Sequence, residues 1–268
     1  GMEITEKGKE VINQLNDYFN HYSDDHKMAN AIKEKYNIKE VHVVPGDSDE
    51  KQSVKREMGR QAGQLLESSL YEDAIVSVTG GSTMAYVSES IHLLPFNVFF
   101  VPARGGLGEN MVYQANTIAS SMAQQAGGYY TTLYVPDNVS ESTYNTLMLE
   151  PSVSHTLDKI KQANVTIHGI GDALKMAHRR QSHKDVIDKL QHHQAVGEAF
   201  GYYFDAQGHI VHKVKTIGLQ LEDLESKDFI YAVAGGQSKG EAIKAYLSIA
   251  PDNTVLITDE AAAKVILN

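Results

Sequence analysis

The sequence has 268 residues, of which 42% are hydrophobic and 22% are charged, and its formal net charge at pH 7 is −10. Nucleic-acid binding depends on Lys and Arg side chains that neutralise phosphates, so 24 cations against 34 anions argue against direct binding of DNA or RNA. No apolar run approaches the roughly 20 residues that a membrane span needs, and no secretory signal is recognisable. The absence of cysteine excludes disulfides and a thiol nucleophile. We therefore expect a globular cytoplasmic domain that is large enough to bury a core.

The first part of the chain predicts an amphipathic helix over residues 5–22. Gly1 precedes Met2, which no native translation start would give, so we treat it as a remnant of expression. Apolar residues recur at steps of three and four residues from Val11 to Tyr22. Such a helix either packs on the body of the protein or connects it to another chain or an upstream domain. We place a boundary between a segment of residues 1–22 and a domain of residues 23–268.

From residue 38 onward, short strands alternate with helices. The strands are nearly continuous apolar runs, as expected where both faces of a sheet are covered. Repeated strand–turn–helix units predict the doubly wound α/β class, a mostly parallel sheet with helices on both faces. The predicted strands are 38–44, 74–79, 98–101, 130–135, 165–168, 229–234 and 255–258, and the predicted helices are 53–66, 82–93, 110–126, 141–148 and stretches that begin at residues 172, 238 and 260.

The loop after the second strand, residues 79–83 (TGGST), is the best candidate for an anion site. Glycines let the backbone approach a ligand closely, and the first N–H groups of a helix lack helical acceptors. With the helix dipole and the hydroxyls of Ser82 and Thr83, these donors would bind a phosphate. The alternative is a tight turn in which Ser82 caps the helix. The pattern is neither a P-loop nor the G-x-G-x-x-G sequence of dinucleotide-binding proteins.

Arginine is rare in this sequence, and three arginines lie outside the predicted strands, two of them near predicted ligand-edge loops. Arg104 lies in the glycine-rich loop after the third strand, and Arg179 and Arg180 follow the helix that begins at residue 172. Arginine suits bidentate recognition of phosphate, whereas lysine serves a solvated surface equally well. These positions therefore favour a recognition role. For Arg179 and Arg180 the alternative is a surface pair.

Glu198 and the 12 histidines give weaker signals. Glu198 lies among small residues, where its carboxylate would accept hydrogen bonds from sugar hydroxyls, cap a helix or face a lysine. The histidines show no metal-binding spacing, and no Cys/His set exists. His168, at a strand end, is expected in the core or behind a site. We expect neither a metal ion nor a cofactor.

Two later stretches complete the pattern. Residues 202–214 form two alternating runs around a Gly208 turn, which predicts a small antiparallel hairpin at an edge or in a subdomain. Residues 234–239 (AGGQSK) repeat a glycine pair at a strand end, followed by Ser238 and Lys239. A lysine in the first turn of a helix opposes the helix dipole, so a bound anion would compensate it. The alternative is that Lys239 points to solvent.

Several long segments resemble, in order, the effector domain of SorC-type transcriptional regulators, and most closely those members that repress glycolytic genes. The resemblance implies a Rossmann-like core similar to sugar-phosphate isomerases and amino-sugar-phosphate deaminases. It also implies that a helix-turn-helix DNA-binding domain precedes this sequence in the full-length protein, with residues 1–22 as its connector. The segments that carry the resemblance are VTGGSTMA (78–85), FVPARGGLGE (100–109), QANTIA (114–119), HGIGDALKMAHRR (168–180), EAFGYYFDAQGHIVHKV (198–214), AVAGGQSKGEAI (232–243) and NTVLITDEAAAK (253–264).

The same resemblance implies a phosphorylated sugar as the effector that relieves DNA binding, and a homodimer or larger oligomer. Fructose 1,6-bisphosphate is the first candidate, followed by dihydroxyacetone phosphate, glucose 6-phosphate and fructose 6-phosphate. Ser82 stands where relatives have threonine, which keeps the hydroxyl. The residues implied for one phosphate are Gly81, Ser82, Thr83 and Lys239, with Gly236 and Ser238 beside them; Arg104 and Gln114 would contact the same ligand, Arg179 the second phosphate and Glu198 the sugar hydroxyls.

Two other functions remain open. A sugar-phosphate isomerase or amino-sugar-phosphate deaminase on the same fold would need a carboxylate or imidazole within hydrogen-bond reach of the reacting carbon. Asp172, Glu198 and His168 are candidates by location. A structural oligomerisation domain would need no ligand at all. The resemblance favours an effector sensor, which needs phosphate donors and coupling to another domain but no general base.

Overall fold

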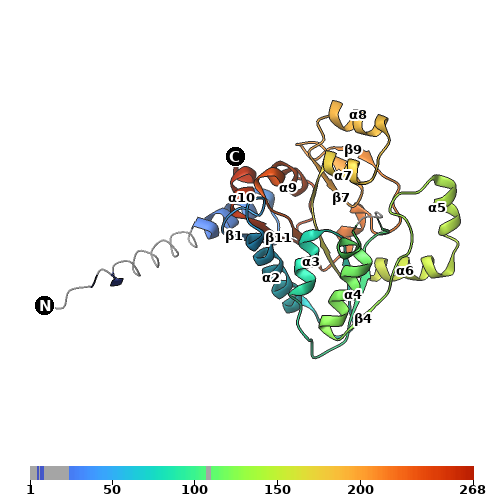
Figure 1. Ribbon diagram of the computed structural model, residues 1–268, viewed down its shortest axis with the longest axis horizontal. Coiled ribbons are helices and arrows are strands. Elements are labelled where there is room, and N and C mark those ends of the chain that lie inside the picture. The colour runs from blue at the N-terminus through green and yellow to red at the C-terminus, as the bar shows by residue number, and fades with distance from the viewer. Residues whose placement is uncertain (1–4, 6, 9–23, 107–109) are drawn as a thin grey trace.

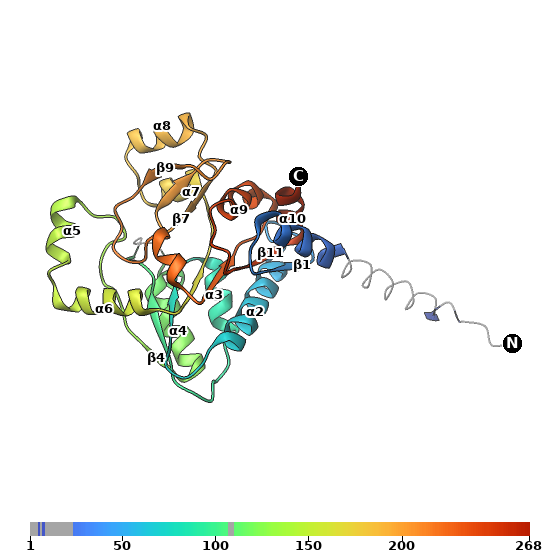
Figure 2. The ribbon, with the colours of Figure 1, turned by 180° about the vertical axis from the view of Figure 1, so that it is seen from behind.

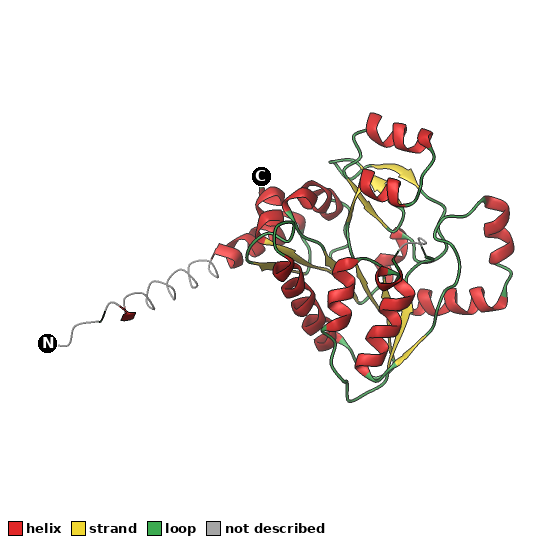
Figure 3. Cartoon of the chain, in the orientation of Figure 1, coloured by secondary structure: helices red, strands yellow, loops and turns green. Residues whose placement is uncertain are grey.

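The computed structural model describes residues 5, 7–8, 24–106 and 110–268. A seven-stranded sheet forms the centre of the molecule, and every pair of neighbouring strands in it is parallel (Figures 1 and 3). This confirms the predicted doubly wound α/β class. The predicted helix over residues 5–22 lies almost wholly outside the described residues and stays a prediction. In the order of the sheet, the strands are β1 (Glu40–Val44), β11 (Thr254–Asp259), β10 (Phe229–Val233), β5 (Val165–His168), β2 (Ala74–Val78), β3 (Val98–Pro102) and β4 (Tyr129–Tyr130).

The order of the strands reverses between β2 and β5. From β2 the chain continues outward through β3 to β4, whereas from β5 it continues in the opposite direction through β10 to β11. The register across the junction pairs Val76 with Val165 and Val78 with Ile167. In open α/β sheets, the helices that follow such strands leave on opposite faces, and the carboxyl ends of the strands then open onto a crevice. The topology alone therefore places a ligand site beyond β2 and β5.

Helices cover both faces of the sheet, as predicted (Figures 1 and 2). On one face, α2 (Gln52–Ser69), α3 (Ser82–Glu89) and α4 (Ala115–Ala126) bury an apolar layer that includes Met58, Leu66 and Met122. Burying each such side chain contributes roughly 1.5–3 kcal/mol. The opposite face is covered by the helical residues 24–36 and by α6 (Pro151–Gln162), α9 (Gly240–Leu247) and α10 (Glu260–Leu267).

A second, four-stranded antiparallel sheet stands beside the carboxyl edge of the large sheet. Its strands, in order, are β6 (Gly171–Asp172), β7 (Gly197–Ala199), β8 (Tyr202–Phe204) and β9 (Ile210–Lys213). The predicted hairpin is the β8–β9 pair, but it belongs to a larger sheet than the sequence indicated. This sheet packs on α7 (Ala173–Arg179) and α8 (Lys184–His192) through a small core of its own.

The predicted strand over residues 130–135 is wrong beyond its first residue. Only Tyr129–Tyr130 pairs with β3. Beyond it, the backbone of Leu133 bonds to the side-chain amide of Asn116 rather than to a strand. The helices α6 and α8 were not predicted. The remaining elements are α5 (Glu141–Leu147) and the short 3₁₀ helices η1 (Met111–Tyr113), η2 (Leu221–Ser226) and η3 (Gln237–Lys239).

Among the described residues, no helix combines the length and apolar character that crossing a bilayer requires.

Candidate functional site

A cavity of about 260 Å³ opens at the point where the strand order reverses. It lies beyond the carboxyl ends of β2, β3, β5 and β10, and the small sheet closes one side. Its volume is close to the lower end of the range for small-molecule sites, about 300–1,000 Å³. Five cations and three carboxylates line it, although the whole chain is acidic.

The loop 79–83 forms one wall of this cavity. Gly81 adopts φ 127°, and a Cβ there would meet no heavy atom within 4 Å, so this backbone faces open space. The N–H of Gly81 donates to the carbonyl of Tyr113 at 2.8 Å and is not available to a ligand. Ala85 is the first amide to donate within α3, to the Gly81 carbonyl. The amides of residues 82–84 therefore lack helical acceptors beside the cavity, as an anion site requires.

Thr79 and Thr83 have different places in this wall. The Thr79 hydroxyl accepts a hydrogen bond from the Gly169 N–H at 3.2 Å and so joins the ends of β2 and β5. Thr83 is 8% exposed and lines the cavity together with Ser82. The hydroxyls predicted to bind phosphate thus lie at the cavity, at the start of an eight-residue helix.

Lys239 enters the cavity from η3. Burial lowers the pKa of its ammonium, and the nearby cations Lys55, Lys175 and Arg179 lower the pKa further, while Asp49 acts in the opposite direction. No carboxylate among the described residues lies within ion-pair distance of its Nζ. Lys239 does not point to open solvent, and a bound anion would relieve its electrostatic environment.

Two more cations come from α7. Lys175 and Arg179 are four residues apart and therefore share one face of the helix, and both line the cavity. Arg179 Nη1 lies 3.8 Å from the sulfur of Met176. Asp172, at the N-cap of α7, accepts a hydrogen bond from the Lys175 N–H at 2.8 Å. Lys175 was not among the predicted site residues.

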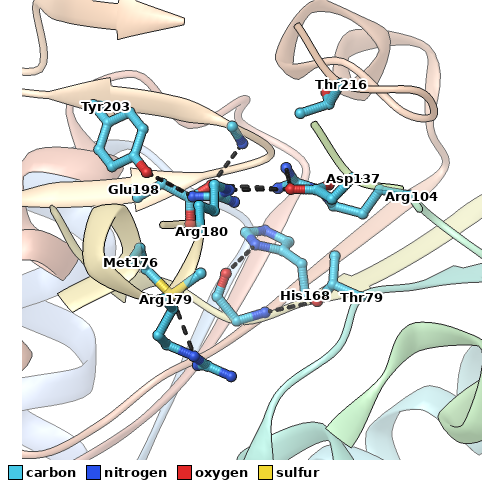
Figure 4. Close-up of polar contacts among 12 residues, drawn as sticks. Thr79, Arg104, Asp137, His168, Met176, Arg179, Arg180, Glu198, Tyr203 and Thr216 are labelled. Carbon is cyan, nitrogen blue, oxygen red and sulfur yellow. Dashed lines mark hydrogen bonds and ion pairs between the residues drawn. The ribbon is translucent and has the colours of Figure 1, made fainter. Parts of the chain in front are cut away.

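Four buried charges form a closed cluster against the cavity (Figure 4). Arg104 binds the Asp137 carboxylate through Nε and Nη2 at 2.7 and 2.9 Å. Arg180 donates from Nε to Asp137 at 3.0 Å and from Nη2 to Glu198 at 2.8 Å. Arg104 Nη1 also reaches Glu198, at 3.3 Å. The cluster ties the end of β3 and the loop at residue 137 to α7 and to the small sheet.

The charges of this cluster stabilise one another. Burial alone would raise the pKa of Glu198, but Arg180 and Arg104 outweigh it and hold the pKa below its usual value. Burial would lower the pKa of Arg180, but Glu198 and Asp137 raise it. Glu198 and Arg180 are therefore ionised at neutral pH, and the cluster pairs two arginines with two carboxylates. The predicted alternative of a surface pair is wrong for Arg180, which is buried, whereas Arg179 is exposed.

The structure brings most of the predicted binding residues together but not all. Gly236 and Ser238 do not line the cavity, and their amides donate instead to Asp259 and Asp49 at 2.7 and 2.8 Å. Their predicted contact with the phosphate stays a prediction without support from this geometry. The predicted residues that do line the cavity are Gly81, Ser82, Thr83, Arg104, Gln114, Arg179, Glu198 and Lys239.

The three groups proposed as an enzymatic base are otherwise engaged. His168 is fully buried outside the cavity lining, where it bonds to the Tyr246 hydroxyl at 2.9 Å and the Gly169 carbonyl at 3.0 Å. Burial lowers its pKa to about 4, although Gly169 and Glu198 oppose the shift. Asp172 caps α7, and Glu198 is held by two arginines. Within the described part of the chain, no group of three or more His, Asp or Glu side chains could hold a metal ion.

Comparison with known proteins shows the family of this chain. Residues 20–268 match the model of the family "Putative sugar-binding domain". The central glycolytic genes regulator of Priestia megaterium is 45% identical over 267 residues, which are 98% of this chain and 78% of that regulator. The chain belongs to this sugar-binding domain family of SorC-type transcriptional regulators. Relatives at this identity are named as regulators of genes and not as enzymes.

Solved structures support the assignment of the sugar-binding domain. A SorC family regulator from Enterococcus faecalis is 42% identical and superposes with a TM-score of 0.85, over 91% of this chain and all of that one. The full-length sorbitol operon regulator SorC from Klebsiella pneumoniae is 20% identical with a TM-score of 0.83, over 92% of this chain and 82% of that one. At that identity the second match shows the fold alone.

Proposed function

We propose that this sugar-binding domain senses a phosphorylated sugar, with fructose 1,6-bisphosphate as the first candidate. One observation carries the proposal: Lys175, Arg179 and Lys239 converge on one cavity of a chain whose net charge is −10. Lys175 and Lys239 have no carboxylate within ion-pair distance among the described residues, and burial, together with the neighbouring cations, lowers the pKa of Lys239. An anion at this position would remove that repulsion.

The arrangement of the donors supports a ligand with two phosphates. The cavity offers the amides at the start of α3, the hydroxyls of Ser82 and Thr83, and Lys239 as donors for one phosphate. It also offers Lys175 and Arg179 on α7, which we assign to the second phosphate. The likeness to regulators named for central glycolytic genes favours fructose 1,6-bisphosphate over dihydroxyacetone phosphate, glucose 6-phosphate and fructose 6-phosphate.

In the full-length protein, we propose, binding of this effector relieves repression of glycolytic genes in the cytoplasm. A helix-turn-helix domain outside this sequence would bind the operator, residues 1–22 would connect it to the sugar-binding domain, and the regulator would act as a homodimer or larger oligomer. A coupling free energy of about 1–3 kcal/mol between effector and operator would change the DNA affinity roughly 5–150-fold.

Thermal unfolding in the presence of candidate effectors tests the proposal. A ligand at 100 times its Kd stabilises the folded state by about 2.7 kcal/mol. For a chain of this size that corresponds to a rise in Tm of roughly 5–10 °C. We expect the largest rise with fructose 1,6-bisphosphate among the four sugar phosphates. No rise with any of them would contradict the proposal and favour a structural oligomerisation domain, and turnover of any of them would favour an enzyme.

A further inference from the structure

The charges around the cavity fall into two sets with different chemistry. Lys175 and Lys239 carry net positive charge, whereas the Arg104–Asp137–Arg180–Glu198 cluster pairs two cations with two anions and is neutral. A phosphate gains little from a neutral cluster that contains two carboxylates. A hydroxyl group, which both donates and accepts hydrogen bonds, suits a surface that offers both donors and acceptors.

Two residues of the cluster that line the cavity, Arg104 and Glu198, have unused hydrogen-bonding capacity. The guanidinium of Arg104 has five N–H groups, and three of them are bound to Asp137 and Glu198. On Glu198, the described donors Arg104, Arg180 and the Gly201 N–H, at 2.6 Å, all reach Oε1. Oε2 lies on the side of Gly171, which lines the cavity, at 3.5 Å from where a Cβ of that glycine would stand. Both a donor and an acceptor therefore remain for a ligand.

Arg180 is the more enclosed of the two arginines in the cluster. Both line the cavity, but the side chain of Arg180 is 1% exposed, against 10% for Arg104. Each nitrogen of the Arg180 guanidinium has its own partner: Nε binds Asp137, Nη2 binds Glu198, and Nη1 donates to the Tyr203 hydroxyl at 2.8 Å. The planar guanidinium fixes the directions of these three hydrogen bonds relative to one another, which a lysine ammonium cannot do.

We propose that Arg180 is a positioning residue for ligand specificity: by fixing Asp137 and Glu198, it orients Arg104 and Glu198 to bind the hydroxyls of a sugar. The inference rests on the proposed function. It implies that charge and hydroxyl groups are recognised by separate residues. The cavity then prefers a sugar bisphosphate to a hydroxyl-free anion of similar charge, because such an anion leaves the hydroxyl-binding groups unpaired.

The test compares two probes, fructose 1,6-bisphosphate and inorganic pyrophosphate, by isothermal titration calorimetry. Arg180→Lys keeps the positive charge but loses the planar guanidinium. We expect it to weaken sugar bisphosphate binding about tenfold or more, as expected when hydrogen bonds to charged groups are lost, and to change pyrophosphate binding less than about twofold. Lys175→Gln is the matched comparison on the same helix. It should weaken both probes by a similar factor, because it removes only charge.

Tyr203→Phe provides a milder variant. It removes one hydroxyl that Arg180 binds, alters no charge, and lies outside the cavity lining. We expect the same selective loss, about two- to fivefold for the sugar bisphosphate alone, as for one neutral hydrogen bond. If circular dichroism shows that Arg180→Lys does not fold, Tyr203→Phe alone tests the positioning role of Arg180.

The outcomes separate the inference from the proposed function. Suppose that the native domain binds fructose 1,6-bisphosphate. If the folded variants then bind both probes equally more weakly, or bind both as tightly as the native domain does, the positioning role of Arg180 is wrong but the proposed sensor function is not contradicted. If the native domain binds no sugar phosphate, the proposed function fails and the inference falls with it. Selective loss of sugar binding in the variants supports both.

Discussion

Two loops of this domain look alike in sequence but have different uses in the structure. Residues 79–83 and 234–239 each place a glycine pair at a strand end, followed by at least one hydroxyl side chain and a helical turn. In the first loop, Gly81 faces the open cavity. In the second, the amides of Gly236 and Ser238 donate to Asp259 and Asp49. The comparison teaches that a backbone shaped for an anion does not require a ligand, because a carboxylate of the same chain can occupy it.

Removing the Asp259 carboxylate, which binds the second loop, should have the largest effect on stability. Asp259 is fully buried and accepts hydrogen bonds from the amides of Ser48, Gly236 and Ala262 at 2.8, 2.7 and 2.9 Å. Asp259→Ala leaves these amides unpaired in the interior and should lower the free energy of unfolding by roughly 3–5 kcal/mol. Urea denaturation measures the change. A loss below about 1 kcal/mol would mean that the second loop does not depend on its carboxylate.

Acid should destabilise the strand that separates the two loops. His168 ends β5, which lies between β2 and β10, and its pKa of about 4 is below the 6.5 of an unfolded chain. Between pH 6.5 and 4 the unfolded state binds the proton and the native state does not, so stability is present above pH 6.5 and is lost as the pH falls. The shift corresponds to about 3 kcal/mol.

Urea denaturation at pH 7 and pH 4.5 measures this contribution. The loss of stability between the two pH values should be smaller in His168→Gln, whereas His183→Gln, on the surface, serves as the control. An equal loss in the native protein and in His168→Gln would show that His168 titrates normally in the folded state.

Alanine at the two corresponding glycines should distinguish the loops by stability. Gly81 and Gly236 have φ of 127° and 97°, so both substitutions store backbone strain of about 1–3 kcal/mol. Only at Gly236 would the new Cβ also collide with Asp49, 2.5 Å from its Oδ1. Gly236→Ala should therefore be the less stable variant by about 1–2 kcal/mol. Equal thermal midpoints of the two variants would contradict this expected difference between the loops.

The last expected change concerns ligand binding rather than stability. Lys239→Ala and Thr83→Ala should each weaken binding of fructose 1,6-bisphosphate about 5–50-fold, equivalent to about 1–2.3 kcal/mol, with the larger effect for the charged group. Ser238→Ala is the matched control in the second loop, where the side chain lies outside the cavity lining. Calorimetric titration measures all three. Loss of folding in Thr83→Ala or Lys239→Ala would assign that residue a structural role instead.

The sequence predicted the large sheet and the position of the cavity because both follow from local patterns. Apolar runs that end in glycine are visible within a few residues, and parallel strands bring their carboxyl ends to one edge. The partners of the second loop were not predictable in this way. Asp49 is 189 residues from Ser238, and only the fold brings β1 and β10 to either side of β11.

The buried cluster shows the same limit for side chains. Arg179 and Arg180 are identical neighbours in the sequence, but successive residues on a helix point about 100° apart, so one is exposed and the other buried. Which of them turns inward depends on the docking of α7 against the small sheet. Asp137 carried no signal at all, because it follows the irregular segment after β4 and gains its role only through Arg104 and Arg180.

A crystal structure of the domain with fructose 1,6-bisphosphate would test the central claim most directly. The account predicts one phosphate within hydrogen-bond distance of the residue 82–84 amides and Lys239, and the other beside Lys175 and Arg179. A phosphate bound at Gly236 and Ser238 in place of the Asp49 and Asp259 carboxylates, or a ligand outside this cavity, would contradict it.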